Sequence, residues 1–431
     1  MKRSIPIILV LALLAAILLI VAAIGSSRLV EVEEVHLMWK YETGANVLSS
    51  PTVYDGVVYV GSFDSEFYAL NASNGEKIWG FKTNESIWSS PTVWKGVVYV
   101  ASMDRSLYAL NATDGTQVWK YSAGSKIESS PLVYDNLVCF GSWDNNVYAL
   151  NASDGSLKWQ HYTGTYVTGS PSIYEGIIYI GSYDGSSRGW LHALNATTGE
   201  LMWEFDTKGE VGTLHPQVYG GIVYFGSWDK NVYALDAKNG TKMWNYTTGD
   251  HITGLAPRVY DGVVYVGSCD FGVYALNASN GEDIWVYWTN GRVQSTPSIY
   301  NGTIYIGSDD SNIYALDTKT GTKYWSFTTG GGVDSSPFVD NGFIYVGSGD
   351  GYVYALAVSK AWIRDYGFLL PISVFLAFVL CLLGICVLTR RNSDNQHHAS
   401  RNYSALRRGA LAELLSRNEC VWGIKLYPNQ P

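Results

Sequence analysis

Cationic, polar and aromatic side chains that could bind a ligand are concentrated between residues 143 and 294. Two histidines and two arginines could bind an anion or an acidic partner, and three tryptophans could supply stacking surface: His215, His251, Arg258 and Arg292 in the first group, Trp143, Trp190 and Trp228 in the second. Arg188 and Gln294 lie close to these residues in the sequence. Arginine and aromatic residues are favoured in binding hot spots. We therefore predict a shallow polar-aromatic binding site, with sequence drift in a repeat as the alternative explanation.

An aspartate recurs after the dipeptide Gly-Ser, or once Ala-Ser, and it could bind either a metal or its own backbone. It occurs eight times, as Asp64, Asp104, Asp144, Asp184, Asp229, Asp270, Asp310 and Asp350. An aspartate in a turn can accept hydrogen bonds from nearby backbone N–H groups. Asp309-Asp310 and Asp350-Gly351 lack the spacing of a known calcium loop. We predict that these carboxylates cap turns and that the chain has no metal site.

The elements that position these residues come from an internal repeat. Tryptophan recurs at 39, 79, 119, 159, 203, 244, 285 and 325, with spacings of 40 to 44 residues. Each copy contains four short strand-like runs. Asp55-Gly56 and Asn74-Gly75 are turn dipeptides in the first copy, and Asp-Gly or Asn-Gly between apolar runs is a strong hairpin signal. Four strands in about 40 residues, repeated in tandem, predict the blades of an all-β propeller.

The motifs also predict the number of blades and the way the ring closes. The Gly-Ser-x-Asp turn and the Ala-Leu strand each occur eight times, the last strand ending at Leu356. No Trp follows Leu356 at the repeat spacing, whereas Trp39 precedes the first complete copy. We therefore predict an eight-bladed β-propeller of four-stranded blades in which the N-terminal strand completes the last blade. This closure removes an exposed sheet edge.

Strand connectivity places the predicted site on one face. Alternate turns of a four-stranded meander share an end, so the Ser-x-Asp turn lies on the same face as the loop between the Trp strand and the Ser-Ser-Pro motif. Three copies change that motif, at Leu214-His215-Pro216, Leu255-Ala256-Pro257 and Ser295-Thr296-Pro297. The fourth copy carries the one long insertion, at 185–190. We predict that the site lies over blades four to seven.

The repeat resembles that of pyrroloquinoline-quinone (PQQ) propellers. The run Val147-Tyr148-Ala149-Leu150-Asn151-Ala152, with Asp154-Gly155 and Trp159, carries the resemblance, which covers nearly all of residues 38–357. That superfamily includes quinoprotein dehydrogenases and cofactor-free scaffold proteins, such as the propeller subunit of the outer-membrane barrel-assembly machine. The resemblance implies, for the dehydrogenases, a vicinal cysteine pair over the cofactor and a calcium site with a catalytic aspartate. Cys139 and Cys269 stand apart in the sequence, so no catalytic residue is transferred to this chain.

Apolar segments at both ends predict membrane attachment. Ile5 to Ile24 is uncharged and long enough to span a bilayer, so residues 1–27 form an uncleaved anchor or a signal peptide. Residues 367–389 are also uncharged and predict a transmembrane helix, followed by Arg390-Arg391 and a basic, largely disordered tail over 390–431. The positive-inside rule places this tail in the cytoplasm and residues 28–360 outside the membrane. Both termini are cytoplasmic if the first segment is uncleaved.

Nine Asn-x-Ser/Thr sequons fall in the predicted outer region, which fits a glycosylated surface protein. They are Asn71, Asn84, Asn111, Asn151, Asn195, Asn239, Asn245, Asn277 and Asn301. Several occupy blade turns, where Asn is also favoured for backbone reasons.

Composition narrows the function further. Of 431 residues 47% are hydrophobic and 16% charged, with a net charge of -9, which disfavours a disordered chain and a nucleic-acid binder. Five cysteines exclude a disulfide scaffold. We predict a membrane-anchored extracytoplasmic propeller that binds membrane or cell-surface proteins or envelope polymers, without a cofactor and more readily a non-enzyme than an enzyme. The alternative is a PQQ-dependent dehydrogenase with calcium.

Overall fold

The computed structural model describes residues 28–211, 215–253 and 256–365, which form strands, turns and loops. The strands are β1 (Arg28–Glu42), β2 (Thr52–Tyr54), β3 (Val57–Gly61), β4 (Glu66–Asn71), β5 (Lys77–Lys82), β6 (Thr92–Trp94), β7 (Val97–Ser102), β8 (Ser106–Asn111), β9 (Gln117–Ser122), β10 (Leu132–Tyr134), β11 (Leu137–Ser142), β12 (Asn146–Asn151), β13 (Leu157–Tyr162), β14 (Ser172–Tyr174), β15 (Ile177–Tyr183), β16 (Gly189–Asn195), β17 (Leu201–Thr207), β18 (Gln217–Tyr219), β19 (Ile222–Gly226), β20 (Asn231–Asp236), β21 (Lys242–Thr247), β22 (Arg258–Tyr260), β23 (Val263–Gly267), β24 (Gly272–Asn277), β25 (Asp283–Trp288), β26 (Ser298–Tyr300), β27 (Thr303–Gly307), β28 (Asn312–Asp317), β29 (Lys323–Thr328), β30 (Phe338–Asp340), β31 (Phe343–Gly347) and β32 (Tyr352–Asp365).

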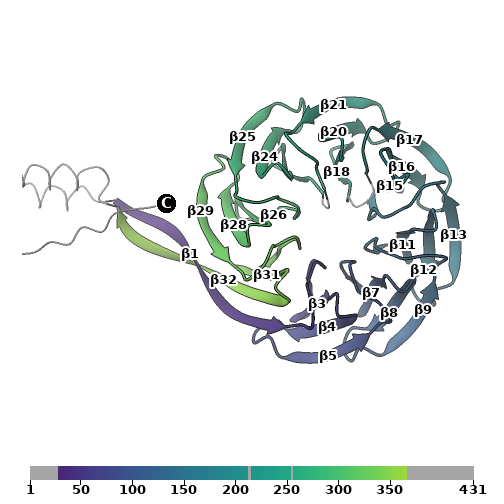
Figure 1. The fold of residues 1–431 in the computed structure, drawn as a ribbon, viewed down its shortest axis with the longest axis horizontal. Helices are drawn as coiled ribbons and strands as arrows, with labels where there is room; N and C mark the ends of the chain where they lie inside the picture. Colours follow the sequence, from purple (N-terminus) through teal and green to yellow (C-terminus); the bar gives the residue numbers. More distant parts are fainter. Residues whose placement is uncertain (1–27, 212–214, 254–255, 366–431) are drawn as a thin grey trace, which may run out of the picture. The chain divides into compact units, whose positions relative to one another are not determined.

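These strands form eight antiparallel four-stranded sheets arranged around one axis (Figure 1). Seven sheets use consecutive strands, from β2–β5 to β26–β29. The eighth has the order β1-β32-β31-β30, so the N-terminal strand completes the last blade. The predicted fold class and the predicted closure are both confirmed. Blades are numbered here from β2–β5, which makes the closing sheet blade eight.

The predicted membrane segments, 1–27 and 367–389, and the tail 390–431 lie outside the described residues. Within the described part of the chain, no helix is long and apolar enough to cross a membrane. Residues Val32–Ala361 form one compact unit, which contains the propeller. The outer ends of β1 and β32 lie outside this unit.

The repeated tryptophans join each blade to the next. Trp39 is 8% exposed, and its Nε1 donates to the carbonyl of Ala72 in blade one, 2.9 Å away. Six further tryptophans make the same bond to the following blade, from Trp79 to Trp285. The large aromatic side chain fills the outer gap between neighbouring sheets. The glycine of the facing turn, such as Gly75, packs directly against the indole.

The recurrent aspartates are occupied as turn caps. Asp64 Oδ1 accepts a bond from the backbone N–H of Glu66, and Oδ2 accepts from the Tyr68 hydroxyl and from the N–H of Gly44. The Tyr–Asp bond recurs in seven blades, with Asp64, Asp104, Asp144, Asp229, Asp270, Asp310 and Asp350 as acceptors. Because Gly44 belongs to the loop before the blade, the carboxylate ties the two loops of one face together. In the described residues no cluster of three His, Cys, Asp or Glu could hold a metal.

The Ser-Ser-Pro motifs form an interrupted ring of hydrogen bonds around the axis. The N–H of Ser50 donates to Ser90 Oγ, Ser90 to Ser130 and Ser130 to Ser170, at 2.9–3.0 Å. Ala256, Thr296 and Ser336 continue the ring back to Ser50. The two links on either side of His215 are absent among the described residues. The ring is therefore broken where the sequence departs from the motif.

Blade four replaces the Tyr–Asp bond with a buried histidine. The insertion at 185–190 displaces Asp184, and His192 stands at the tyrosine position, 2% exposed. His192 Nε2 lies 2.8 Å from Ser182 Oγ, and its Nδ1 lies 3.6 Å from Glu204. Ser182 is fully buried, so this arrangement offers no nucleophile to a substrate. Burial, with a smaller effect of nearby His161, lowers the pKa of His192 to about 4.

This histidine should make stability depend on pH. An unfolded chain protonates its histidines near pH 6.5, whereas folded His192 resists protonation down to about pH 4. The contribution of His192 to stability is therefore fully present above pH 6.5. It falls as the pH decreases from 6.5 to 4, by about 3 kcal/mol. We expect His192→Gln to flatten the pH dependence of chemical unfolding in this window. His36→Gln is the control, because His36 is exposed; an equal flattening by both variants would contradict the assignment.

Candidate functional site

One face of the propeller is built from two loops of every blade. The turn between the second and third strands and the loop that leads into the next blade meet there, and we call this the upper face. A buried Val or Ile anchors each incoming loop; Val47 and Ile87 are examples, both 0% exposed. The anchor explains the Gly of the Gly-Ser motif, because a Cβ on Gly61 would lie 2.2 Å from Ile87. One backbone bond of the upper face, between the incoming loop and the turn, is thus present in all eight blades.

Three positions of this framework vary and form the surface of the upper face. The residue before the anchor is Asn46, Ser86, Lys126, Tyr166, Glu210, His251, Arg292 or Gly332. The residue after it, leaving aside blade five, is Leu48, Trp88, Glu128, Thr168, Thr253, Gln294 or Asp334. The residue after Gly-Ser is Phe63, Met103, Trp143, Tyr183, Trp228, Cys269, Asp309 or Gly349, and its N–H donates to the carbonyl of the first position in every blade.

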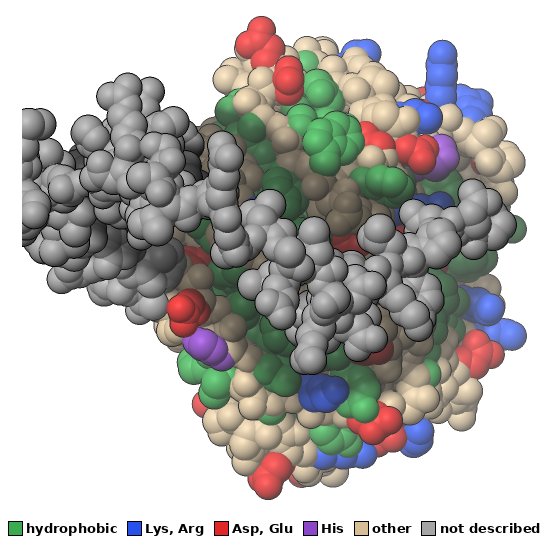
Figure 2. Space-filling model, turned by 60° about the vertical axis from the view of Figure 1, so that its left-hand side comes forward, with side chains coloured by type: hydrophobic (Ala, Val, Ile, Leu, Met, Phe, Trp, Pro, Cys, Tyr) green, Lys and Arg blue, Asp and Glu red, His purple; other side chains and the backbone are tan. Residues whose placement is uncertain are grey.

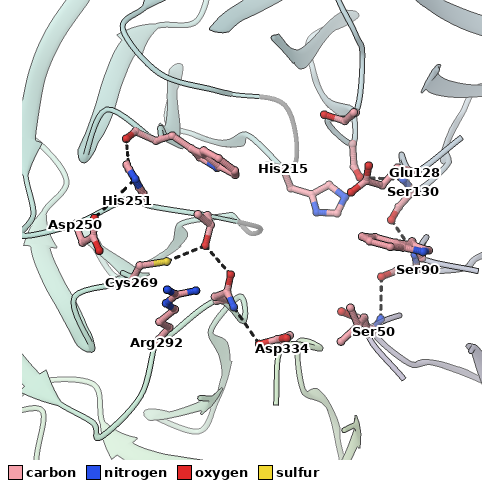
Figure 3. A pocket seen from close by; sticks show the side chains of 17 residues that line it. Ser50, Ser90, Glu128, Ser130, His215, Asp250, His251, Cys269, Arg292 and Asp334 are labelled. Carbon is pink, nitrogen blue, oxygen red and sulfur yellow. Dashed lines mark hydrogen bonds and ion pairs between the residues drawn. The ribbon is translucent and has the colours of Figure 1, made fainter. Parts of the chain in front are cut away.

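The second variable position and some residues of the other two, together with residues of the Ser-Ser-Pro motifs, line a pocket at the axis, which we call the axial pocket (Figure 3). Its volume is about 480 Å³. Its lining comes from all eight blades: Leu48, Ser50, Trp88, Ser90, Glu128, Ser130, Thr168, Ser170, His215, Trp228, Asp250, His251, Thr253, Cys269, Arg292, Gln294 and Asp334. A cavity of this size with convergent polar groups is the usual form of a ligand site.

The structure brings together five of the nine residues predicted to bind. His215, Trp228, His251, Arg292 and Gln294 all line the axial pocket. Arg258 lies on inner strand β22, donates from Nε to the carbonyl of Pro297 and does not line the pocket. Trp143 also lies outside the lining, and its Nε1 donates to Glu128.

Arg188 and Trp190 lie at the hairpin of β15 and β16, where Arg188 lines a second, smaller pocket. Arg188 pairs with Asp206, and its guanidinium lies 5.2 Å from the centre of the Trp190 ring. Ser187, Arg188, Asp206, Thr207 and Lys208 line that small pocket. The predicted site over blades four to seven is therefore divided between the axis and this hairpin.

Two histidines of the axial pocket differ in their surroundings. His215 is flanked by the broken ring, and its imidazole points toward the side of the pocket that carries Glu128 and Ser130 (Figure 3). Burial, and then the charge of Arg258, lowers the pKa of His215 to about 4, so it is neutral at pH 7. His251 stacks on Trp228 with ring centres 5.7 Å apart, and its Nδ1 contacts the Trp228 carbonyl.

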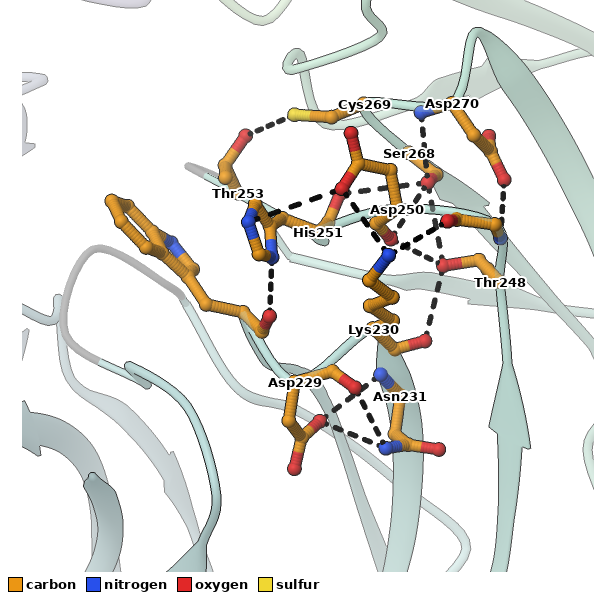
Figure 4. A network of polar contacts seen from close by, with 12 residues as sticks. Asp229, Lys230, Asn231, Thr248, Asp250, His251, Thr253, Ser268, Cys269 and Asp270 are labelled. Atoms are coloured by element: carbon orange, nitrogen blue, oxygen red, sulfur yellow. Dashed lines mark hydrogen bonds and ion pairs between the residues drawn. The ribbon is translucent and has the colours of Figure 1, made fainter. Parts of the chain in front are cut away.

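A polar network fixes the His251 side of the pocket (Figure 4). Lys230 Nζ donates to the carbonyl of Gly249 and lies 3.7 Å from Asp250 Oδ1. Thr253 contacts both the Cys269 thiol and Gln294. The backbone N–H of His251 and nearby positive charges lower the pKa of Asp250. By contrast, no ion pair or side-chain hydrogen bond holds the exposed guanidinium of Arg292 among the described residues.

Carboxyl groups are the main feature of the pocket that the sequence did not predict. Burial raises the pKa of Glu128 to about 6, although its bond from Trp143 acts in the opposite direction. Burial and the nearby Glu128 raise the pKa of Glu210 to about 7; Glu210 lies on the upper face but does not line the pocket. Burial, together with contact with Asp309, also raises the pKa of Asp334. A comparison of equivalent positions between repeats would have marked these three residues as variable, but would not have shown that Glu128 and Asp334 line the same cavity.

Two exposed tryptophans stand at the pocket. Trp88 is 38% exposed and stacks on Phe63 with ring centres 4.7 Å apart; Trp228 is 39% exposed. Trp88 was not among the predicted residues, because the copy that contains it keeps the Ser-Ser-Pro motif. On the face seen in Figure 2, acidic, basic and hydrophobic side chains are interspersed, without a basic stripe. This surface suits a mixed polar and aromatic contact.

The residues do not fit the quinone–calcium site that the resemblance implies for dehydrogenases. Cys139 lies on β11 of blade three and Cys269 follows β23 of blade six; both are free thiols. The two therefore cannot form a vicinal pair. No three acidic, histidine or cysteine side chains of the described residues could hold calcium. The absence of a cofactor stays a prediction, which the proposal below makes testable.

The predicted glycosylation asparagines lie away from the axial pocket. Five of them accept hydrogen bonds from their own turns at the face opposite the upper face: Asn71, Asn111, Asn151, Asn195 and Asn277. Asn239 and Asn301 also lie in turns at that face, Asn245 on outer strand β21 and Asn84 in an upper loop. Use of these sequons stays a prediction that intact-mass measurement tests.

Comparison with known proteins agrees with this architecture. A family model described as outer membrane protein assembly factor BamB matches residues 15–88, 83–186, 167–294 and 286–364. No curated protein matches the chain. The crystal structure of BamB from Moraxella catarrhalis matches with a TM-score of 0.63 and 18% identity over 75% of this chain and 100% of that one.

Two other solved structures share the fold. The computationally designed Ika8 protein gives a TM-score of 0.66 at 15% identity, over 73% of this chain and 97% of that one. A europium-containing methanol dehydrogenase gives 0.64 at 14% identity, over 75% and 93%. At these identities the structural matches establish the fold alone.

Proposed function

The chain belongs to the family of the outer membrane protein assembly factor BamB, and from this premise we propose that it is a non-enzymatic scaffold that binds a protein partner through its upper face. The observation that carries the proposal is the division of the repeat into a constant frame and a variable upper face. Every blade keeps the same backbone bonds there, while the side chains that these bonds present differ. A rigid frame with variable side chains is how binding sites are commonly built.

The composition of the axial pocket supports a protein partner over an envelope polymer. Trp88 and Trp228 are exposed beside it, and the Arg292 guanidinium is exposed and has no ion-pair partner among the described residues. Tryptophan and arginine are the residues that dominate protein–protein hot spots. We further propose that the propeller lies outside the membrane and is tethered by the apolar segments at its ends. The arginines after residue 389 support this orientation.

The test is co-purification of partners with the full chain from solubilised membranes. We expect the double variant Trp88→Ala/Trp228→Ala to lose a partner that the unchanged chain captures. Each central tryptophan contributes about 2 kcal/mol or more to binding, so the pair should weaken affinity by roughly a thousandfold. Trp288→Ala is the matched control, because Trp288 is 60% exposed but lies on outer strand β25. Equal capture by all three forms would overturn the proposal.

The dehydrogenase alternative has its own test. Purified full chain, mixed with PQQ and calcium, would show quinone absorbance that persists after gel filtration, and dye-linked oxidation of alcohols. The scaffold proposal predicts neither signal. Either signal at one equivalent of bound quinone would favour the enzyme.

A further inference from the structure

One half of the axial pocket contains an acidic side chain, Glu128, without a partner of opposite charge among the described residues. Glu128 lines the pocket and accepts one side-chain hydrogen bond, from Trp143 Nε1 at 3.2 Å. No Lys, Arg or His forms an ion pair with Glu128 among the described residues. A partly buried carboxylate without a counter-ion is unfavourable in a protein interior. The unfolded chain, in water, does not have this penalty.

A second observation points to a ligand in the same half. Thr168 is 2% exposed and lines the pocket, and no group of the described residues forms a hydrogen bond with its Oγ1. Buried hydroxyls are almost always bonded, so an open one that faces a cavity marks a place where a ligand group can bind. Thr168 and Glu128 occupy the same loop position in adjacent blades, as does Trp88 in the blade before them. The three side chains therefore follow one another around the axis.

The indole of Trp88 provides an aromatic face next to Glu128 and Thr168. The indole of Trp88 is stacked on Phe63 on one side and is 38% exposed. The face of an indole attracts a cation within about 6 Å of its centre, most strongly when the cation loses water. The neighbouring His215 is neutral and adds no positive charge at pH 7. Arg292 lies on the other side of the pocket, with blade seven, where Figure 3 shows it away from Glu128.

We propose that this half of the axial pocket receives a cationic side chain, an arginine or lysine of the bound partner, between the Trp88 indole, the Glu128 carboxylate and the Thr168 hydroxyl. This inference rests on the proposed function and specifies which group of the partner enters the pocket. The cation supplies the charge that Glu128 lacks, and a guanidinium or ammonium N–H can donate to Thr168 Oγ1. Burial has raised the pKa of Glu128, and a bound cation would lower it again.

A defined probe tests the proposal on the full chain in detergent. The protein is labelled with 5-fluorotryptophan, and the ¹⁹F resonance of Trp88 is assigned with Trp88→Phe. The probe is the peptide acetyl-Gly-Gly-Arg-Gly-Gly-amide, and citrulline in place of arginine removes the charge while keeping the shape. We expect a saturable shift of the Trp88 resonance with the arginine peptide and at least tenfold weaker binding of the citrulline peptide. Spermidine distinguishes a free polyamine from a side chain.

Two variants keep the test independent of folding. Glu128→Gln retains an acceptor for Trp143 and removes the charge, and it should weaken binding of the arginine peptide at least tenfold. Thr168→Val has nearly the same shape and should weaken binding severalfold. Glu76→Gln, in an exposed turn of the opposite face, should change nothing. Equal binding of the arginine and citrulline peptides, unchanged binding by Glu128→Gln, or binding of spermidine alone would overturn the proposal.

The outcome is separable from that of the proposed function. Suppose that the unchanged chain and Glu128→Gln capture a partner equally, and that Trp88→Ala/Trp228→Ala loses it. The scaffold proposal is then supported, and the proposal that a cationic side chain binds beside Glu128 is wrong. If capture of every partner is independent of the two tryptophans, the proposed function itself is wrong.

Discussion

Replacing Trp39 by alanine should lower the free energy of unfolding of the full chain by about 3 to 5 kcal/mol, the usual result for truncating a buried tryptophan. Trp39 belongs to β1, which precedes all complete blades, yet it is 8% exposed and bonds to Ala72 of blade one. The variant loses this packing at the junction where the ring closes. Urea unfolding followed by circular dichroism measures the loss.

Two other tryptophans make this result interpretable. Trp119→Ala should destabilise the chain by a similar amount, because Trp119 is also 8% exposed and makes the same bond to Ala152 inside the ring. Trp288→Ala should change stability by less than about 0.5 kcal/mol, as an exposed substitution does. If β1 did not close the last blade, Trp39→Ala would behave like Trp288→Ala.

Gly115→Ala should destabilise the chain by about 2 to 5 kcal/mol. Gly115 has a φ of +72°, which is unfavourable for a residue with a Cβ by about 1 to 2 kcal/mol. A Cβ there would also lie 2.5 Å from Cε3 of Trp79, and such overpacking adds about 1 to 3 kcal/mol. Thermal or chemical unfolding of the full chain checks the sum.

Gly56→Ala separates the two contributions. Gly56 has nearly the same backbone, with a φ of +74°, but a Cβ there meets no atom within 4 Å. It should therefore cost only the backbone part, about 1 to 2 kcal/mol. Equal losses for Gly56→Ala and Gly115→Ala would mean that the tryptophan does not pack on the facing turn.

The fold was predictable because every blade repeats the same pattern of apolar strands and turn residues. The turn dipeptides fixed the hairpins, and the missing tryptophan after Leu356 revealed that Trp39 closes the ring. The Asp64 cap was also predictable, since an aspartate beside a turn has few other roles. Its bond to Gly44 of the incoming loop was not, because that contact depends on how two loops meet in space.

The site was only partly predictable, because its members are separated in the sequence and are alike only in their place in the repeat. His251 and Arg292 were visible as unusual residues, and both line the axial pocket. Glu128 and Trp88 looked like ordinary loop residues, since nothing local shows that the loops of blades two and three converge on the axis. Arg258 was also predicted to bind, but it lies on inner strand β22 and its Nε donates to the carbonyl of Pro297.

The interrupted serine ring links the fold to the site. Blades five and six each carry one more residue in the incoming loop than the other blades do, and these are the blades where the ring is broken. His215 takes the place of a serine there and lines the pocket. The replacement of serine by His215 therefore both interrupts the hydrogen-bonded ring and changes the lining of the pocket.

Site-specific photo-crosslinking in native membranes tests the central claim, that the upper face binds the partner, most directly. A photoreactive amino acid replaces Lys126, which is exposed on the upper face beside Glu128, and in parallel Val118 on outer strand β9 and Tyr134 on the opposite face. We predict one defined protein adduct from position 126 and none from 118 or 134. An adduct from 118 or 134, with none from 126, would contradict the account.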